Sequence, residues 1–142
     1  MNEEQVTEAV EEYLEREGWT MFAVDYPTSG SGLRLHPNDR EAGTKHSGSI
    51  VPDIVAHRDG TVLIVECKPH FDRHDARKLD EVAEGRYSDS LERRVYSTDV
   101  REVATALAFP KSDESSVEPE LLSQIDSLLL VGDDSLVFEK EA

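Results

Sequence analysis

The sequence of 142 residues contains one cysteine, Cys67, so no disulfide can form within the chain. A chain without disulfides is typical of the reducing cytoplasm, and we expect a cytoplasmic location. No apolar run approaches the roughly 20 residues that a membrane-spanning helix requires. Acidic residues crowd the N-terminal positions where a signal peptide would have its apolar core, so we expect neither export nor a membrane partner.

Basic residues are also scarce, with 15 Lys and Arg against 31 Asp and Glu, a net charge of −16. DNA-binding domains are ordinarily basic, because neutralising phosphates releases counterions. The excess of acids lies in the flanks, since residues 30–101 hold 12 of the basic and 13 of the acidic residues. An acidic surface with ten Arg and five Lys is similar to that of halophilic proteins, for which molar salt shortens the Debye length to about 3 Å. The alternative is that the acidity rejects nucleic acid and that the partner is a protein.

Hydrophobic periodicity predicts a single α/β domain over residues 1–142. The expected order is helix 3–17, strand 20–26, loop 27–49, strands 50–58 and 61–68, helix 72–86, a weaker strand 92–98 and helix 99–108. Asp99, with Glu102 three residues later, matches a capping box for that last helix. An acidic connector follows at 110–119, then a short helix at 121–125 and a C-terminal hairpin at 127–139.

Two apolar runs in the middle of the chain carry three charged side chains. Asp53 lies in the first run, and Glu66 and Lys68 lie in the second. Asp59-Gly60 between the runs predicts a hairpin, because this dipeptide accepts the positive φ angles of tight turns. Residues two apart on a strand share a face, so Glu66 and Lys68 project together, and Asp53 can face the same point from the neighbouring strand. Buried charges persist mainly in pairs or on metals, and two carboxylates suit a hard divalent cation beside an attacking water.

Pro52-Asp53, followed after a turn by Glu66-Cys67-Lys68, resembles the motif of the PD-(D/E)XK nuclease superfamily. The setting extends the likeness, with an amphipathic helix before the motif, a strand-turn-strand pattern around it and a helical pattern after the lysine. The chain is also similar to archaeal Holliday-junction resolvases in Gly18-Trp19, in the strand from Met21 to Val24 and in Ser29-Gly30-Ser31. The likeness covers residues 3–85 closely and the remainder loosely, and the long loop before Pro52 and the acidic C-terminal part depart from the resolvase pattern.

The resemblance implies a restriction-endonuclease-like core, a central mixed β-sheet flanked by helices, in a metal-dependent DNA endonuclease. It implies that Asp53, Glu66 and the backbone carbonyl of Cys67 hold Mg²⁺ or Mn²⁺, while Lys68 orients water and stabilises negative charge. Many relatives act as dimers, so a homodimer is one arrangement that the resemblance raises. A junction, a flap, a damaged duplex, an unmodified recognition site and RNA all stay open as substrates.

In this superfamily a glutamate on the first helix usually completes the metal shell. Glu3 is the best-placed candidate, because it lies at the edge of the apolar stripe of that helix. Counting back from Gly18, as the resolvases would have it, reaches the neighbourhood of Thr7 instead. The stripe itself is expected to comprise Val6, Ala9, Val10, Tyr13 and Leu14.

The loop at 27–49 is long for a compact domain, and long ordered loops are often functional. Ser29, Ser31 and Arg34 can donate hydrogen bonds to phosphate, which makes them candidates for nucleic-acid binding. A surface loop without a ligand explains the same residues equally well. After the motif, Arg73, Arg77 and Lys78 can lie along a helix near the site, although a solvated role is the simpler interpretation of each.

Two further interpretations of the motif stay open. The fold can carry the same residues as a non-catalytic module that binds nucleic acid or protein. Lys68 and the two carboxylates can also form a buried salt bridge, which looks identical in sequence. His70 and His74 are spaced for zinc, but Pro69 and the expected helix cap Asp72 argue against a shared helical face. Cys67 is expected to point to the opposite face of its strand and to be structural.

Overall fold

A computed structural model describes residues 1–26, 32–38, 48–95 and 100–142. None of the helices in these ranges is long and apolar enough to span a membrane. The helices and strands are, in chain order, α1 (Glu3–Arg16), β1 (Thr20–Val24), β2 (Ile54–Arg58), β3 (Thr61–Cys67), α2 (Arg73–Ala83), α3 (Ser88–Arg94), β4 (Glu102–Pro110), the 3-10 helices η1 (Lys111–Ser116) and η2 (Pro119–Leu121), β5 (Ser127–Val131) and β6 (Val137–Glu141).

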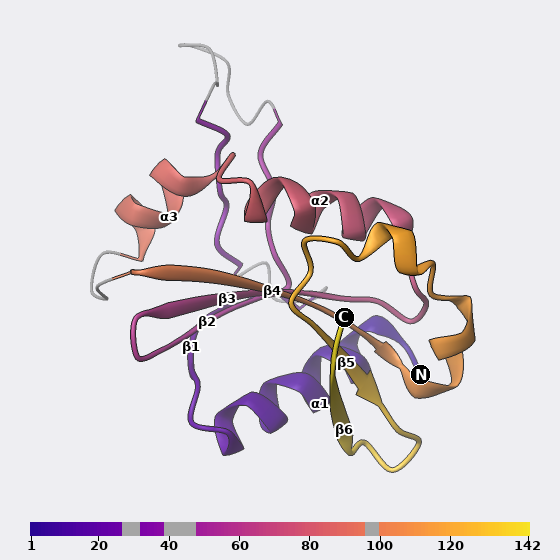
Figure 1. Ribbon diagram of the computed structural model, residues 1–142. Helices are drawn as coiled ribbons and strands as arrows, with labels where there is room; N and C mark the ends of the chain where they lie inside the picture. The colour runs from indigo at the N-terminus through magenta and orange to yellow at the C-terminus, as the bar shows by residue number, and fades with distance from the viewer. Residues whose placement is uncertain (27–31, 39–47, 96–99) are drawn as a thin grey trace.

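The six strands form one sheet whose spatial order follows the chain, from β1 to β6. β2 runs antiparallel to both of its neighbours, β1 and β3. β4 lies parallel to β3 and β5 parallel to β4, and β6 runs antiparallel to β5. Helix α1 covers one face of the sheet, and α2 and α3 cover the other (Figure 1). The predicted α/β architecture, a mixed sheet flanked by helices, is confirmed.

Two apolar cores fill the spaces between the sheet and its helices. On the α1 face, Val6, Val10 and Leu14 pack against strand residues that include Ile54 and Val65. The α2 face is built in the same way from Ala76, Leu79 and Val82, together with Tyr87 and Leu91 around α3. Adjacent strand residues alternate between the two cores, since side chains along a strand point to opposite faces. This alternation decides which face each charged residue of the motif reaches.

Helix α1 begins with a reciprocal cap. The side chain of Asn2 accepts a hydrogen bond from the backbone of Gln5, and the side chain of Gln5 accepts one from the backbone of Asn2. This capping box satisfies two backbone donors that the first turn would otherwise leave without partners. The predicted apolar stripe is confirmed, with Val6, Ala9, Val10 and Leu14 buried and Tyr13 partly buried beside them.

The hairpin of β2 and β3 also follows the sequence. Asp59 and Gly60 have φ values of 50° and 85°, the positive angles that a tight two-residue connection requires. The register pairs Ile54 with Val65 and Arg58 with Thr61. The turn therefore sets which residue of the first run lies opposite Glu66.

Two predicted elements after α2 are wrong. Residues 88–94 form helix α3 where a strand was expected from 92, and residues 102–110 form strand β4 where a helix was expected. The alanines of β4 favour a helix locally, but β3 and β5 pair with both of its edges. Residues 105–109 of this parallel strand are all buried, so no alternation reveals it. Glu102 therefore belongs to a strand and caps no helix, and Asp99 lies outside the described residues.

The helices before β5 differ from those expected in type and position. The connector includes η1, and the short helix expected at 121–125 is replaced by η2, which ends at Leu121. Beyond it, β5 and β6 form the antiparallel hairpin that the sequence predicted around Gly132. β6 is the edge strand of the sheet, and its residues from Phe138 to Glu141 are exposed.

Candidate active site

Asp53 and Glu66 meet on the α2 face of the sheet. Because Ile54 pairs with Val65, continuing the register by one residue places Asp53 opposite Glu66. Val55 and Ile64, two residues from each acid, belong to the core beneath α2, so the acids point the same way. Both are buried, at 8% exposure for Asp53 and 2% for Glu66. The structure thus brings the two predicted carboxylates together.

Cys67 connects the two acids through its backbone. Its N–H donates a hydrogen bond to Asp53 Oδ2 over 2.7 Å. In an extended strand the N–H and C=O of one residue point to the same side, so the Cys67 carbonyl is directed toward the Asp53 side of β3. The Cys67 side chain lies in the core beneath α1, on the opposite face from Glu66, as predicted.

Lys68 follows β3 directly and pairs with the first helix. Its Nζ atom lies 3.5 Å from Glu3 Oε1, and the two side chains are 36% and 31% exposed. Glu3 therefore lies at the same end of the sheet as the motif. Thr7, the alternative position, is buried, and its hydroxyl donates to the Glu3 carbonyl over 2.9 Å.

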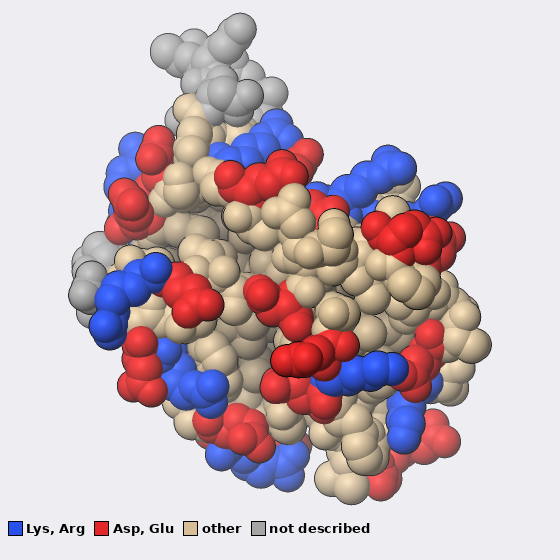
Figure 2. Space-filling view, in the orientation of Figure 1, with Lys and Arg blue, Asp and Glu red and all other residues tan. Residues whose placement is uncertain are grey.

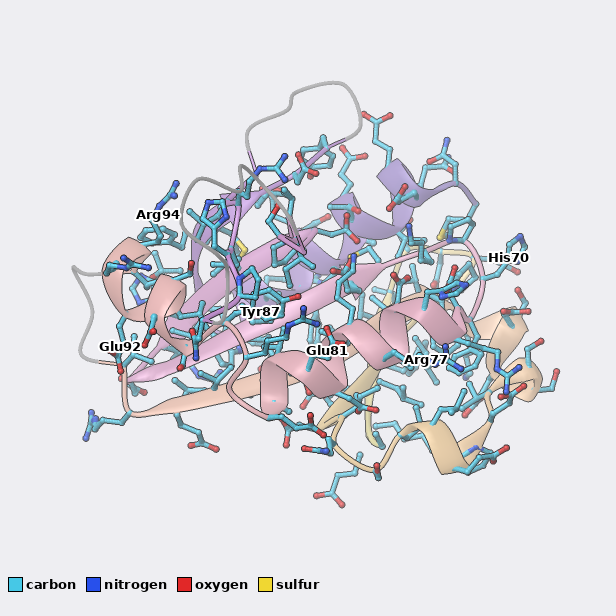
Figure 3. The ribbon with its side chains drawn as sticks, turned by 90° about the horizontal axis from the view of Figure 1, so that it is seen from above. His70, Arg77, Glu81, Tyr87, Glu92 and Arg94 are labelled. Atoms are coloured by element: carbon cyan, nitrogen blue, oxygen red, sulfur yellow. The ribbon has the colours of Figure 1, made fainter. Side chains whose placement is uncertain are left out.

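Two residues of α2 complete the cluster. Lys78 was expected on a helix near the site, with a solvated role as the simpler interpretation, and Asp75 was not predicted from the sequence. Lys78 Nζ lies 3.1 Å from Glu66 Oε1 and 4.0 Å from Asp75 Oδ1. Asp75 is 4% exposed. It lies four residues before Leu79 and seven before Val82, so the apolar stripe of α2 was a signal that Asp75 faces the sheet. Arg77, between them, lies on the exposed side of α2 (Figure 3).

The cluster is electrostatically crowded. Burial raises the pKa of Glu66 well above its usual value, the Asp53 carboxylate raises it further, and Lys78 opposes both. Burial likewise raises the pKa of Asp75 to about 6, against the opposing charges of Lys68 and Lys78. Burial alone would lower the pKa of each lysine, but the surrounding carboxylates outweigh it and raise both pKa values. Both ammonium groups are therefore held in the charged form.

The donor set fits a hard divalent cation. Glu66 Oε1 and Asp75 Oδ2 are buried oxygens that lack a hydrogen-bond partner among the described residues, so the Lys78 contact is an ion pair without hydrogen-bond alignment. Carboxylate and carbonyl oxygens are the ligands that Mg²⁺ and Mn²⁺ prefer. Within the described ranges no three His, Cys, Asp or Glu side chains are already arranged as a metal site. A cation here would therefore combine two carboxylates with the Cys67 carbonyl and water.

Of the residues predicted to contact nucleic acid, the structure describes Arg34 but neither serine. Ser29 and Ser31 lie outside the described residues. Arg34 is partly buried, and its Nη1 donates to Ser49 Oγ over 2.8 Å, which ties residues 32–38 to the segment before Ile50. Leu35 and Ile50 form a β-bridge beside this contact.

The histidine pair does not form a helical metal site. His74 is in the first turn of α2, and its backbone N–H donates to the capping Asp72 side chain over 2.7 Å. His70 precedes the helix and projects at its starting end (Figure 3). The expectation that the two histidines do not share a helical face is confirmed.

Two crystal structures are similar to this chain. One is of an XisH family protein from Nostoc punctiforme PCC 73102, with 18% identity, a TM-score of 0.45 and coverage of 97% of this chain and 99% of that one. The other is of an fdxN element excision controlling factor protein from Anabaena variabilis, with 18% identity, a TM-score of 0.42 and coverage of 94% and 95%. No family model and no curated protein matches the chain.

Proposed function

We propose that this chain is a metal-dependent endonuclease of the PD-(D/E)XK type that hydrolyses phosphodiester bonds in DNA. The observation that carries the proposal is the pairing of two buried carboxylates, Asp53 and Glu66, with Lys68 directly after the strand that carries Glu66. Two carboxylates this close repel each other unless a proton or a cation lies between them. Glu66 Oε1 is buried and accepts no hydrogen bond within the described residues, and its contact with Lys78 is an ion pair, so this oxygen remains able to bind a cation.

Asp53, Glu66 and the Cys67 carbonyl would hold Mg²⁺ or Mn²⁺, which when bound supplies Lewis acidity toward phosphate and lowers the pKa of water. The hydrogen bond from the Cys67 N–H fixes the Asp53 carboxylate in its orientation. Lys68 is 36% exposed, so its ammonium can reach both the site and a phosphate in solvent. There it would orient the attacking water and stabilise the charge that develops on the phosphate.

The overall charge of −16 does not exclude DNA. On the face shown in Figure 2, Lys and Arg alternate with Asp and Glu, and neither sign forms a broad patch. A surface of this kind lacks long-range attraction for DNA, so binding would depend on local contacts and on salt that screens the acidic flanks. Because salt screens the repulsion between the acidic flanks and DNA, the proposed enzyme should work best at high ionic strength.

A second candidate function is a non-catalytic binding module on the same fold. The observation that favours it is the ion pair between Lys78 and Glu66, which gives the buried acid a partner without metal. Under this alternative the cluster is a structural charge network, and the Lys68 side chain serves only to pair with Glu3.

A cleavage screen separates the two candidates. Branched, flapped, single-stranded and duplex DNA, and RNA, are incubated with the protein and Mg²⁺ or Mn²⁺ in concentrated potassium chloride. We expect metal-dependent cleavage of DNA that Glu66→Gln abolishes and Lys140→Gln, a substitution on exposed β6, leaves intact. Binding of the same substrates without any cleavage by the wild type would favour the binding module.

A further inference from the structure

The described residues place two lysines at the carboxylate cluster, whereas the motif supplies one. Lys68 contacts Glu3, and Lys78 contacts Glu66 at 3.1 Å. The Lys78 side chain is 30% exposed and that of Glu66 is 2% exposed, so Lys78 reaches from the surface of α2 to a buried acid. The second lysine therefore lies on the same oxygen that the proposed function assigns to a metal.

We propose that Lys78 is the internal counter-ion of this site, that it competes with a divalent cation for Glu66, and that it moves to Asp75 when the cation binds. The inference rests on the proposed function of Asp53 and Glu66 as ligands. An ammonium group and a divalent cation cannot share Glu66 Oε1 without strong repulsion across a few ångströms of protein interior. Occupation of this oxygen by one therefore disfavours its occupation by the other.

Asp75 is the acceptor that the geometry offers. It lies three residues before Lys78 on the same face of α2, and its Oδ1 is already 4.0 Å from Lys78 Nζ. Its Oδ2 is buried and has no hydrogen-bond partner within the described part of the chain. A rotation of the Lys78 side chain can therefore exchange Glu66 for Asp75 while α2 stays in place, because residues three apart are neighbours on a helix.

The exchange couples metal binding to the position of Lys78. Before a cation arrives, the ammonium neutralises Glu66 and prevents a buried unpaired charge, which would destabilise the fold. When a cation binds, part of its binding energy is spent on displacing Lys78, so its apparent affinity is lower than that of the bare carboxylates. Removing the Lys78 charge should therefore tighten metal binding.

The test is a calorimetric titration of the full chain with Mn²⁺, using wild type, Lys78→Gln and Lys78→Arg. We expect Lys78→Gln to bind Mn²⁺ about 5- to 150-fold more tightly, the usual range for coupled sites, and Lys78→Arg to bind like wild type. Lys140→Gln is the matched control, because Lys140 forms an exposed pair with Glu114 at 2.9 Å on the edge strand. Equal or weaker affinity in Lys78→Gln would overturn the proposal.

If Lys78→Gln does not fold without metal, a thermal melt with Mn²⁺ decides between two interpretations. If Mn²⁺ restores a cooperative melt, the cation replaces the ammonium and the proposal stands. If the variant stays unfolded with Mn²⁺, Lys78 is a structural residue and the proposal fails.

The role of Asp75 is tested by a double-mutant cycle. Asp75→Asn should weaken Mn²⁺ binding in the wild-type background, because the displaced ammonium loses its acceptor, and should have little effect in the Lys78→Gln background. An equal effect in both backgrounds would show that Asp75 acts independently of Lys78.

These readouts do not depend on cleavage. A protein that binds Mn²⁺ with the expected differences but cuts no nucleic acid would overturn the endonuclease and keep the role of Lys78. A protein that cuts DNA while Lys78→Gln leaves Mn²⁺ affinity unchanged would overturn only the role of Lys78.

Discussion

Asp53 Oδ2 accepts a buried hydrogen bond of 2.7 Å from the backbone nitrogen of Cys67, the residue that separates Glu66 from Lys68. The bond joins the loop before β2 to the end of β3, beyond the last residue pair of the hairpin ladder. It therefore holds Asp53 at the site independently of any metal.

Substitutions of Asp53 should separate this structural role from metal binding. Asp53→Asn keeps an oxygen acceptor for the Cys67 N–H, so we expect the free energy of unfolding to change little. Asp53→Ala leaves that N–H buried without an acceptor and should cost about 1–3 kcal/mol in urea unfolding. Both variants should bind Mn²⁺ more weakly, because each removes a negative charge from the ligand set. Wild-type Mn²⁺ affinity in Asp53→Asn would remove Asp53 from the ligands.

Lys68→Ala should slow DNA cleavage and leave metal binding intact or improved, because both acids stay in place. Its pair with Glu3 is about one third exposed, and exposed ion pairs contribute at most about 1 kcal/mol. Thermal melts, Mn²⁺ titration and cleavage assays on this variant check the three effects. A loss of about 3–5 kcal/mol would instead indicate a buried ion pair and count against a catalytic role.

Stability should depend on pH through Asp75. Burial raises the pKa of its carboxyl in the folded protein from 3.8 to about 6. Between these values the folded state binds more protons than the unfolded state, so this contribution is complete below the lower value and is lost as pH rises through about 6. Relative to Asp75→Asn, the wild type should lose stability across that window in urea titrations with a chelator present. A pH-independent difference between the two proteins would contradict the assignment.

The acidic flanks should make the fold sensitive to salt. In dilute buffer the excess carboxylates repel one another, and added potassium chloride screens them, so we expect the melting temperature to rise with salt. A melting series from dilute to molar potassium chloride checks this. If the midpoint were constant or fell, the halophilic interpretation would be wrong and the acidity would count against a nucleic-acid partner.

The hairpin that carries the motif was predictable because local chemistry determines it. Asp59 and Gly60 supply the positive φ angles, and alternation along β3 places Glu66 and Cys67 on opposite faces. Helix α1 was predictable for a similar reason, since its stripe has the helical period. In each case residues close in sequence carry the whole signal.

Strand β4 and the contact of Lys78 depend on partners far away in the chain. The run from Glu102 to Pro110 is a strand because β3 and β5 take up its backbone groups, whereas its alanines alone favour a helix. Lys78 is a helix surface residue by pattern, and only the docking of α2 on the sheet places it against Glu66. Side-chain spacing reports the face of a helix, but the partner beneath that face comes from tertiary packing.

Because Cys67 is buried, the reactivity of its thiol reports local opening of the native protein. Cys67 is the one thiol in the chain, is fully buried beneath α1 and lies between two residues of the proposed site. Burial also raises the pKa of the thiol, so the closed protein presents almost no reactive thiolate. The rate at which a thiol reagent labels the native protein therefore measures how often the end of β3 opens. A comparison with and without Mn²⁺ would show how metal binding changes that rate, and it requires no engineered probe.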